Sequence, residues 1–203
     1  IGNAACPDIP SKPNKPELLP PRSMPKRKIG TESGKIALIH SVAHIEFNAI
    51  DLHWDIIARF GHMKFPISFY DDWVSAARDE TKHFELLSRL LIDRESYYGA
   101  LPAHDSMWDA AKITNNDILG RWAVVPRVLE ARGLDVTPNM IKLFERSGEK
   151  KAVEYLNIIY SEEVSHVSYG SKWFNFLCGR NNLDPKLTFH KLVRKYFHTT
   201  MHK

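Results

Sequence analysis

Apolar residues recur every three or four positions through most of the chain, which is the spacing of one face of an α-helix. Ile39, Ala43, Ile50 and Ile57 form such a stripe in the first of these stretches. The pattern predicts an all-α fold with long helices at about 31–60, 68–91, 106–132 and 149–177, and shorter helices at about 138–147 and 184–203.

The residues between the helices indicate how the helices connect. Thr31 can cap the first helix, and residues 61–66 turn the chain into the second. Residues 93–106 are typical of the long crossover that links two helical hairpins. The last residues of this segment, His104 and Asp105, can cap the third helix.

Proline and glycine mark the predicted interruptions. Pro126 lies inside the third helix, where it should kink the helix or open a gap in its backbone hydrogen bonds. Residues 133–137 should end that helix, and Pro138 suits the first turn of a new, short one. Asp184 and Pro185 supply the cap and first turn of the final helix.

Four glutamates and two histidines fall on the apolar stripes at matched positions. Two helices each carry a Glu-x-x-His motif, whose two side chains share one helical face and can bind one ion. A further glutamate precedes each motif at a similar distance. This is the ligand set of carboxylate-bridged di-metal four-helix bundles. The predicted metal ligands are Glu46, Glu80, His83, Glu130, Glu163 and His166.

Length and charge agree with this prediction. The segment from Glu46 to the end of its helix is as long as the segment from the start of the next helix to Glu80, so the two carboxylates should meet at one height. Four ionised glutamates match the charge of two divalent ions. Mixed glutamate and histidine ligands predict a cofactor of two Fe ions, with Mn as the alternative. Structural ion pairs are the other interpretation of these six residues.

Three more residues lie near the predicted ligands. His53 could donate a hydrogen bond to a ligand or be an ordinary core residue. Arg127 could hydrogen-bond a ligand carboxylate or extend to the surface. Tyr160 is a candidate redox-active or hydrogen-bonding phenol, or a core tyrosine. Glu162 points about 100° away from the ligand face and is left out of the ligand set.

The opposite face of the first helix is polar. We expect this face to be solvated, with a second metal patch or a partner surface as alternatives. Its residues are His40, His44, Asn48, Asp51 and Asp55.

Length and composition indicate one domain with tails. The chain has 203 residues, of which 43% are hydrophobic and 26% charged. We divide it into an extended Pro-rich arm (1–30), a di-metal bundle (31–183) and a basic amphipathic helix (184–203). No apolar run approaches the ~20 residues of a transmembrane helix. Cys6 and Cys178 indicate no disulfide framework and favour a reducing compartment, cytoplasm or mitochondrial matrix.

The net charge of +4 is uneven, because both ends are basic and the middle is acidic. The arm ends in the basic run 25–28, which includes Arg27. These ends could bind RNA or another anionic substrate, or dock on a larger protein assembly. A solvated tail and a helix packed on its own domain are the alternatives.

The six ligands resemble those of the ferritin-like superfamily, and the doubled Glu-x-x-His is closer to its oxygen-activating and bacterioferritin-type members than to ordinary ferritins. The strings at 43–52 (AHIEFNAIDL), 69–73 (FYDDW) and 125–135 (VPRVLEARGLD) resemble an uncharacterised ferritin-like domain family over most of the chain. The string at 129–132 (LEAR) is similar, more weakly, to the bacterial di-iron hydroxylase of a hypermodified tRNA adenosine, but lacks the longer run that follows there. The resemblance implies a ferritin-like four-helix bundle with a long crossover, and no particular substrate.

Three functions of different classes follow. The first is a di-iron hydroxylase or oxidase that uses dioxygen on a small-molecule or RNA substrate. The second is a non-catalytic accessory subunit of a larger complex, which the long arm and basic tail favour. The third is iron storage with ferroxidase activity, which needs a cage. The complete ligand set favours the first.

Overall fold

The structure is a computed structural model that describes residues 6–26, 28 and 30–201, with side chains up to residue 196. Every regular element in these ranges is helical, which confirms the all-α prediction, and the one β-type pairing there is an isolated bridge between Leu18 and Ala103. The elements are η1 (Pro21–Ser23), α1 (Glu32–Phe60), η2 (Gly61–Met63), α2 (Ile67–Ile92), α3 (Ser106–Ile113), α4 (Ile118–Val124), the π-helix η3 (Val125–Glu130), α5 (Ala131–Arg146), α6 (Lys150–Arg180) and α7 (Pro185–Met201).

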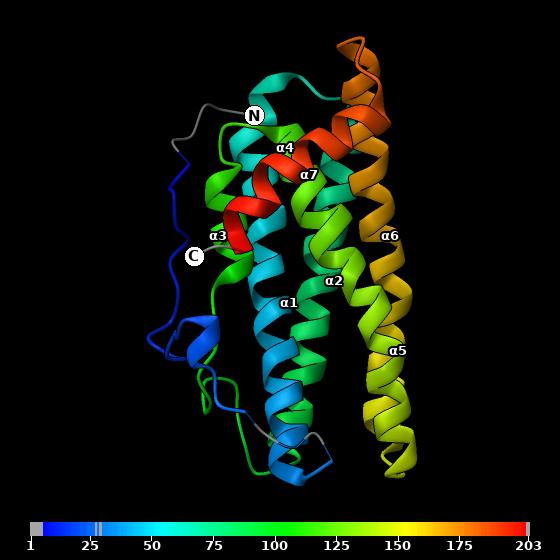
Figure 1. Cartoon of the computed structure of the whole chain (residues 1–203). Coiled ribbons are helices and arrows are strands. Elements are labelled where there is room, and N and C mark those ends of the chain that lie inside the picture. The colour runs from blue at the N-terminus through cyan, green and yellow to red at the C-terminus, as the bar shows by residue number, and fades with distance from the viewer. Residues whose placement is uncertain (1–5, 27, 29, 202–203) are drawn as a thin grey trace.

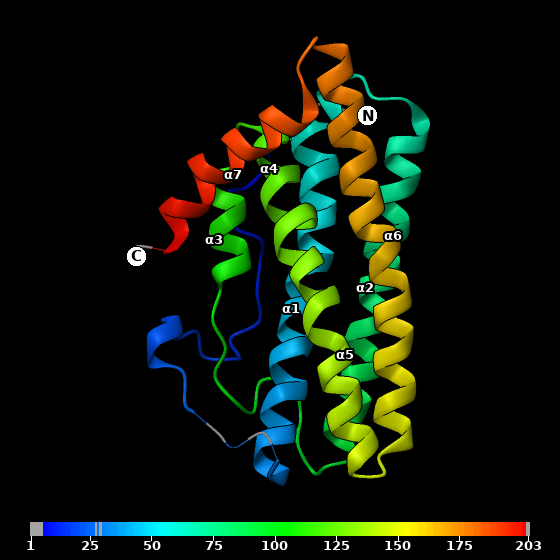
Figure 2. The same cartoon turned by 45° about the vertical axis from the view of Figure 1, so that its right-hand side comes forward.

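The long helices lie side by side in a bundle (Figures 1 and 2). α1 and α2 form one antiparallel pair, and α4, η3 and α5 follow a single path that runs antiparallel to α6. α7 crosses one end of the bundle over α4. The helices predicted at 31–60, 68–91 and 149–177 are confirmed to within a few residues.

Two apolar clusters fill the core at different heights. The first cluster is aromatic, lies at the end that α7 crosses, and is centred on Phe69, Trp73, Trp122, Trp173 and Phe174. The second lies towards the other end and is centred on Ile39, Leu87, Leu91, Phe144 and Leu156. The predicted ligands occupy the positions between these two sets on α1, α2 and α6. Apolar layers therefore separate the polar middle of the bundle from water at both ends.

The predicted helix at 106–132 is interrupted, and this correction has a local cause. Residues 114–117 form a turn between α3 and α4. The Thr114 hydroxyl donates to the Ala110 carbonyl at 2.8 Å, and Asp117 Oδ1 accepts from the Gly120 amide at 2.9 Å. Threonine, asparagine and aspartate compete with the helix for its backbone groups, and here they end one helix and cap the next.

Pro126 and Pro138 have different effects on the helices that contain them. Pro126 lies in η3, so the predicted disturbance of the backbone ladder is confirmed as a π-turn. The predicted break at 133–137 is wrong, because α5 runs through Pro138 to Arg146. The Thr137 hydroxyl donates a hydrogen bond to the Gly133 carbonyl at 2.8 Å, which links the two ends of the segment where the break was predicted. Burial of Ile141 and Phe144 against α6 then outweighs the cost of the proline.

The N-terminal arm lies along α1 and the segment that precedes α3 (Figure 1). Backbone hydrogen bonds tie residues 17–19 to Ala103. Lys12 Nζ donates to Asn48 Oδ1 and to Asp105 Oδ1, both at 2.6 Å. Asp105 occupies the N-cap position of α3, as predicted. Its side chain, however, binds Lys12 of the arm and makes no capping hydrogen bond to the helix.

The expectation of a solvated polar face on α1 is wrong, because the arm and the crossover cover it. His44 Nδ1 lies 2.8 Å from the Tyr98 hydroxyl, and its Nε2 lies 3.1 Å from Asn48 Nδ2. The Gly99 amide donates to His40 Nε2 at 2.9 Å. Helical periodicity carries no information about such contacts with distant parts of the chain. The buried residues of this face are His40, His44, Asn48 and Asp55.

Asp55 ties α1 to α3 and α4. Arg121 is 1% exposed and donates from Nη1 to Asp55 Oδ2 at 2.5 Å. The same guanidinium donates to the Thr114 hydroxyl and the Ala111 carbonyl, and Arg59 donates to both oxygens of Asp55. Burial alone would raise the pKa of Asp55, but the two arginines lower it below its usual value. This buried charge pair fixes the α3–α4 turn on the bundle.

The C-terminal helix packs on its own domain. Asp184 Oδ1 caps α7 by accepting from the Leu187 amide at 2.7 Å, as predicted. The Tyr196 hydroxyl donates to Asp117 Oδ2 at 2.7 Å. No helix in the described ranges combines the length and the apolarity that crossing a membrane requires. Residues 1–5 of the arm and Arg27 of its basic run lie outside the described residues.

α6 passes η3 at Gly170. A Cβ at this position would lie 2.6 Å from both Cβ and Cγ of Pro126, so no larger residue fits without movement of the backbone. Pro126 and α6 are therefore in close contact, with no gap between the two helices at this point of the described structure.

Gly170→Ala should destabilise the protein by about 1–3 kcal/mol, because the proline ring cannot rotate away from the added methyl group. Gly179→Ala in the same helix is the control, since its methyl group would have no described atom within 4 Å. The control should be neutral or stabilising by up to about 1 kcal/mol. Urea unfolding measures both, and equal effects would contradict the close packing at Gly170.

Candidate metal centre

The structure brings the predicted ligands and His53 into the polar middle of the bundle. Each of these residues is less than a tenth exposed, and His53, Glu80, His83 and His166 are fully buried. α1 provides Glu46 and His53, α2 provides Glu80 and His83, the end of η3 provides Glu130, and α6 provides Glu163 and His166.

One group consists of Glu46, Glu80, His83 and Glu163, each with a ligand atom within 4.8 Å of the others. His83 Nδ1 lies 3.3 Å from Glu46 Oε2, 3.3 Å from Glu80 Oε2 and 3.9 Å from Glu163 Oε1. Two atoms bound at about 2.1 Å to one ion, about 90–110° apart, lie roughly 3.0–3.4 Å from each other. The two shorter distances fit such a pair, and the third is slightly longer.

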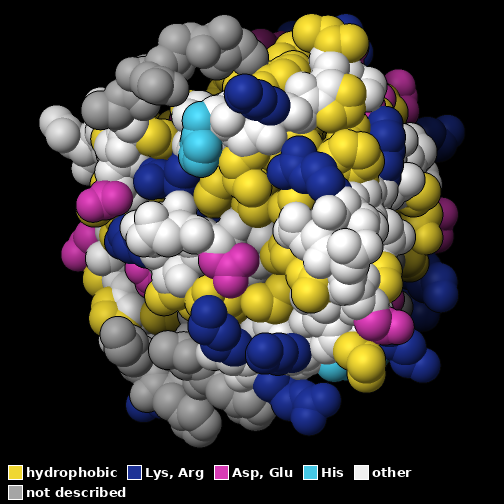
Figure 3. Space-filling view, turned by 90° about the horizontal axis from the view of Figure 1, so that it is seen from above, with side chains coloured by type: hydrophobic (Ala, Val, Ile, Leu, Met, Phe, Trp, Pro, Cys, Tyr) yellow, Lys and Arg dark blue, Asp and Glu magenta, His cyan; other side chains and the backbone are white. Residues whose placement is uncertain are grey.

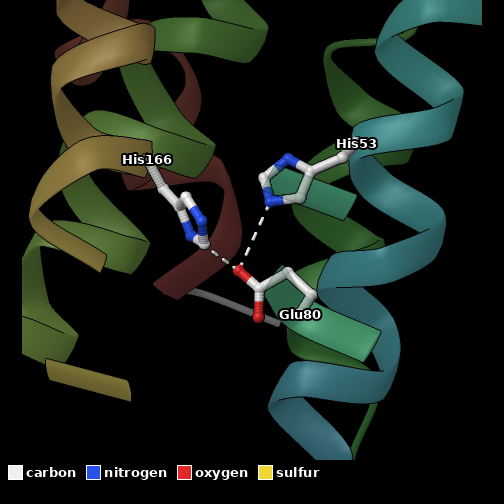
Figure 4. A group of neighbouring side chains, drawn as sticks. All are labelled: His53, Glu80 and His166. Carbon is white, nitrogen blue, oxygen red and sulfur yellow. Dashed lines mark hydrogen bonds and ion pairs between the residues drawn. The ribbon is translucent and has the colours of Figure 1, made fainter. Parts of the chain in front are cut away.

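A second group shares Glu80 and adds His53 and His166. Figure 4 shows one carboxylate oxygen of Glu80 facing both imidazoles. This oxygen, Oε1, lies 3.0 Å from His166 Nδ1 and 3.4 Å from His53 Nε2. Glu80 therefore directs Oε2 at the first group and Oε1 at the second, so this one carboxylate could bind an ion in each group.

Glu130 borders the second group without joining it. Its Oε1 lies 3.9 Å from His53 Nε2, and within the described structure neither of its oxygens has a hydrogen-bond partner. Burial, together with the charges of Glu163 and Glu80, raises the pKa of Glu130 well above its usual value. A buried carboxylate without a donor costs free energy, and a bound cation would remove that cost.

Without metal, this cluster holds protons. Burial and Glu80 raise the pKa of Glu46 well above its usual value. Burial would raise that of Glu80 as well, but hydrogen bonds from Glu46 and His166 outweigh it and hold the pKa well below its usual value. Burial would lower the pKa of each motif histidine, yet the surrounding carboxylates raise it to about 11 for His83 and about 12 for His166. Metal binding must therefore displace protons from this site.

The residue before each motif glutamate contacts the histidine of the other motif. Glu162 Oε2 lies 2.8 Å from His83 Nε2, and Asp79 Oδ2 lies 3.6 Å from His166 Nε2. A carboxylate in this position favours a proton on the outer nitrogen, which leaves Nδ1 free to bind an ion. Glu162 lies outside both ligand groups, but these two contacts were not predicted. The sequence feature that could have predicted these contacts is the acidic residue directly before each motif glutamate.

The other two predicted neighbours contact different parts of the core. The Arg127 guanidinium lies over the rings of Phe174 and Phe189, 4.5 and 4.1 Å from their centroids, and does not hydrogen-bond a described ligand carboxylate. A π-turn holds more residues than an α-turn, so Arg127 and Glu130 no longer share a face. Tyr160 is half-buried and packs on the second apolar cluster.

Glu162→Gln should weaken metal binding roughly 10–100-fold, because the amide holds the His83 tautomer less firmly than a carboxylate does. Glu154→Gln is the matched control, since Glu154 is exposed on the same helix. Competition with a chromogenic chelator measures both affinities. If the two variants bind metal as tightly as the wild type, the contact between Glu162 and His83 has no role in the site.

Comparison with known proteins places the chain in a family. A family model described as "Protein of unknown function (DUF455)" matches residues 2–203. An uncharacterized protein of Haemophilus influenzae is 40% identical over 194 residues, which cover 93% of this chain and 67% of that protein. No solved structure matches the chain. Because the family match includes every helix described above, the chain belongs to the DUF455 family.

Proposed function

We propose that this protein is a ferritin-like di-iron protein that activates dioxygen and acts as a hydroxylase or oxidase. The observation that carries the proposal is the buried cluster of four glutamates and three imidazoles. Three of its carboxylate oxygens, two on Glu130 and one on Glu163, have no hydrogen-bond partner among the described residues. Ion pairs alone would leave these oxygens unsatisfied, whereas two metal ions in the cluster would place positive charge beside them.

The donor set and its charge support iron, with manganese as the alternative. Glutamate oxygen and histidine nitrogen together suit first-row ions of this kind, whereas an all-oxygen site would suit magnesium or calcium. Four ionised glutamates would neutralise two divalent ions, so the occupied cluster carries no net charge into the core.

The chain's own residues set the conditions for the chemistry. A reduced iron pair, when bound, would supply two electrons to dioxygen. Trp73 stacks on His53 with ring centroids 5.4 Å apart, and Trp122 stacks on Trp73 at 6.5 Å. These rings exclude water from one side of the cluster. Glu162 keeps the His83 proton on Nε2, the nitrogen that faces away from the ligands.

Basic side chains at one end of the bundle support an anionic substrate (Figure 3). Figure 3 shows Lys and Arg side chains spread among apolar ones at the end where α6 leads into α7. That end also holds a cavity of about 440 Å³, whose lining includes Arg59, His62 and Asn181. Arg59 lies about 9 Å further along α1 than His53. A molecule in this cavity would therefore lie towards that end of the bundle and would not contact the predicted ligands. An anionic small molecule or RNA remains the proposed substrate class.

The long arm and the basic tail favour the accessory-subunit alternative. In the structure the described arm contacts α1, and α7 packs on α4. The enzyme proposal depends instead on the buried cluster, which docking on a partner would not require.

Removal of metal should lower the melting temperature by roughly 5–10 °C, since a ligand present at about 100 times its Kd stabilises by about 2.7 kcal/mol. Glu163→Ala should abolish most of this dependence, because it removes a ligand of the first group. Differential scanning calorimetry with and without chelator measures the shift. An unchanged melting curve after verified metal removal would contradict a metal-dependent core.

The reaction itself is tested by loading the protein with ferrous iron without oxygen, admitting oxygen and following the optical spectrum. The wild type should oxidise iron at least tenfold faster than Glu130→Ala, which lacks the buried carboxylate that borders the second group. Glu145→Ala, exposed on α5, is the control and should match the wild type. If the wild type is no faster than Glu130→Ala or free ferrous ion, the oxygen-activating function is refuted.

A further inference from the structure

We propose that His53 is a seventh metal ligand, so that one ion is bound by two imidazoles and the other by one. This inference rests on the di-metal centre proposed above and specifies its two halves. The doubled motif by itself supplies one histidine to each ion, through His83 and His166. His53 lies outside the motifs, and as a ligand it would give one ion a second histidine.

The position of His53 is that of a ligand. It lies on α1 two helical turns after Glu46, on the same inner face, and is fully buried. Its Nε2 is 3.4 Å from Glu80 Oε1, and one atom each of His53, Glu80 and His166 lie within 4.8 Å of one another. The same nitrogen is 3.9 Å from Glu130 Oε1.

The 3.4 Å between His53 Nε2 and Glu80 Oε1 is long for a hydrogen bond and lies at the upper end of the range for two ligands of one ion. A normal N–H···O bond is about 2.9–3.0 Å, whereas two ligands of one ion lie roughly 3.0–3.4 Å apart. A hydrogen bond from His53 to Glu80 would also leave both oxygens of Glu130 without a partner in the described structure. An ion between His53, Glu80 and His166 would place a positive charge beside Glu130 as well.

The ring of His53 is held with Nε2 towards Glu80 (Figure 4). Trp73 stacks against one face of the ring at a centroid distance of 5.4 Å and an interplanar angle of 30°. His166 meets it edge-on at 5.6 Å and 68°. Packing on these two neighbours orients the nitrogen before any ion binds, as a preformed ligand requires.

Unlike ligand sets should give the two ions unlike affinities. The ion at Glu46, Glu80, His83 and Glu163 has one imidazole among carboxylates. The ion at His53, Glu80 and His166, with Glu130 beside it as the further carboxylate, has two imidazoles. Binding should therefore proceed in two resolved steps, and removal of the His53 imidazole should weaken only one of them.

Co(II) with ¹⁵N-labelled histidine provides the test, because only an imidazole bonded to the ion receives its unpaired spin density. Each such imidazole N–H resonance moves far downfield, so the NMR spectrum counts the ligating histidines. We expect three of these resonances in the fully loaded wild type. We expect two in His53→Gln, with one of its two Co(II) affinities lowered at least tenfold.

His44→Gln is the matched control, since His44 is a buried histidine of the same helix that bonds to Tyr98 and Asn48. It should retain three resonances. The count in the wild type decides the question even if a variant does not fold. Two resonances in a wild type that binds two Co(II) ions would refute His53 as a ligand and leave the six-ligand centre intact. A wild type that binds no Co(II) would refute the di-metal centre, and this inference with it.

Discussion

Burial of four carboxylates in the middle of a helical bundle is the constraint on which the rest of the structure depends. Glu80 is fully buried and shared by both ligand groups, with one oxygen directed at His83 and the other at His53 and His166. Helices from both halves of the chain must converge on it. Buried negative charge of this kind costs folding free energy. Two positive ions would offset that cost and would join the helices that carry the carboxylates.

The rest of the fold holds these helices in register. The aromatic cluster at one end and the aliphatic cluster at the other keep water from the polar middle. The π-turn ends at Glu130, and the contact between Pro126 and Gly170 sets how closely that turn approaches α6. The arm covers the outer face of α1, so that this helix is buried on both sides along much of its length.

The sequence was sufficient where the signal is local. Helical periodicity located α1, α2 and α6, and two Glu-x-x-His motifs on inner stripes identified residues that the fold does bring together. It was insufficient where distant segments decide the outcome. The polar face of α1 is buried because residues such as Lys12 and Tyr98 reach it from elsewhere in the chain. Arg127 was misplaced because a π-turn changes which residues share a face, and periodicity assumes an α-helix throughout.

The central claim is that this cluster binds two ions. X-ray diffraction from crystals of the iron-loaded protein, recorded on both sides of the iron absorption edge, tests it most directly. Two anomalous peaks are expected adjacent to Glu80, one beside His83 and the other beside His166. Side chains in the positions described here, with no anomalous peak among them in crystals of verified iron content, would contradict it.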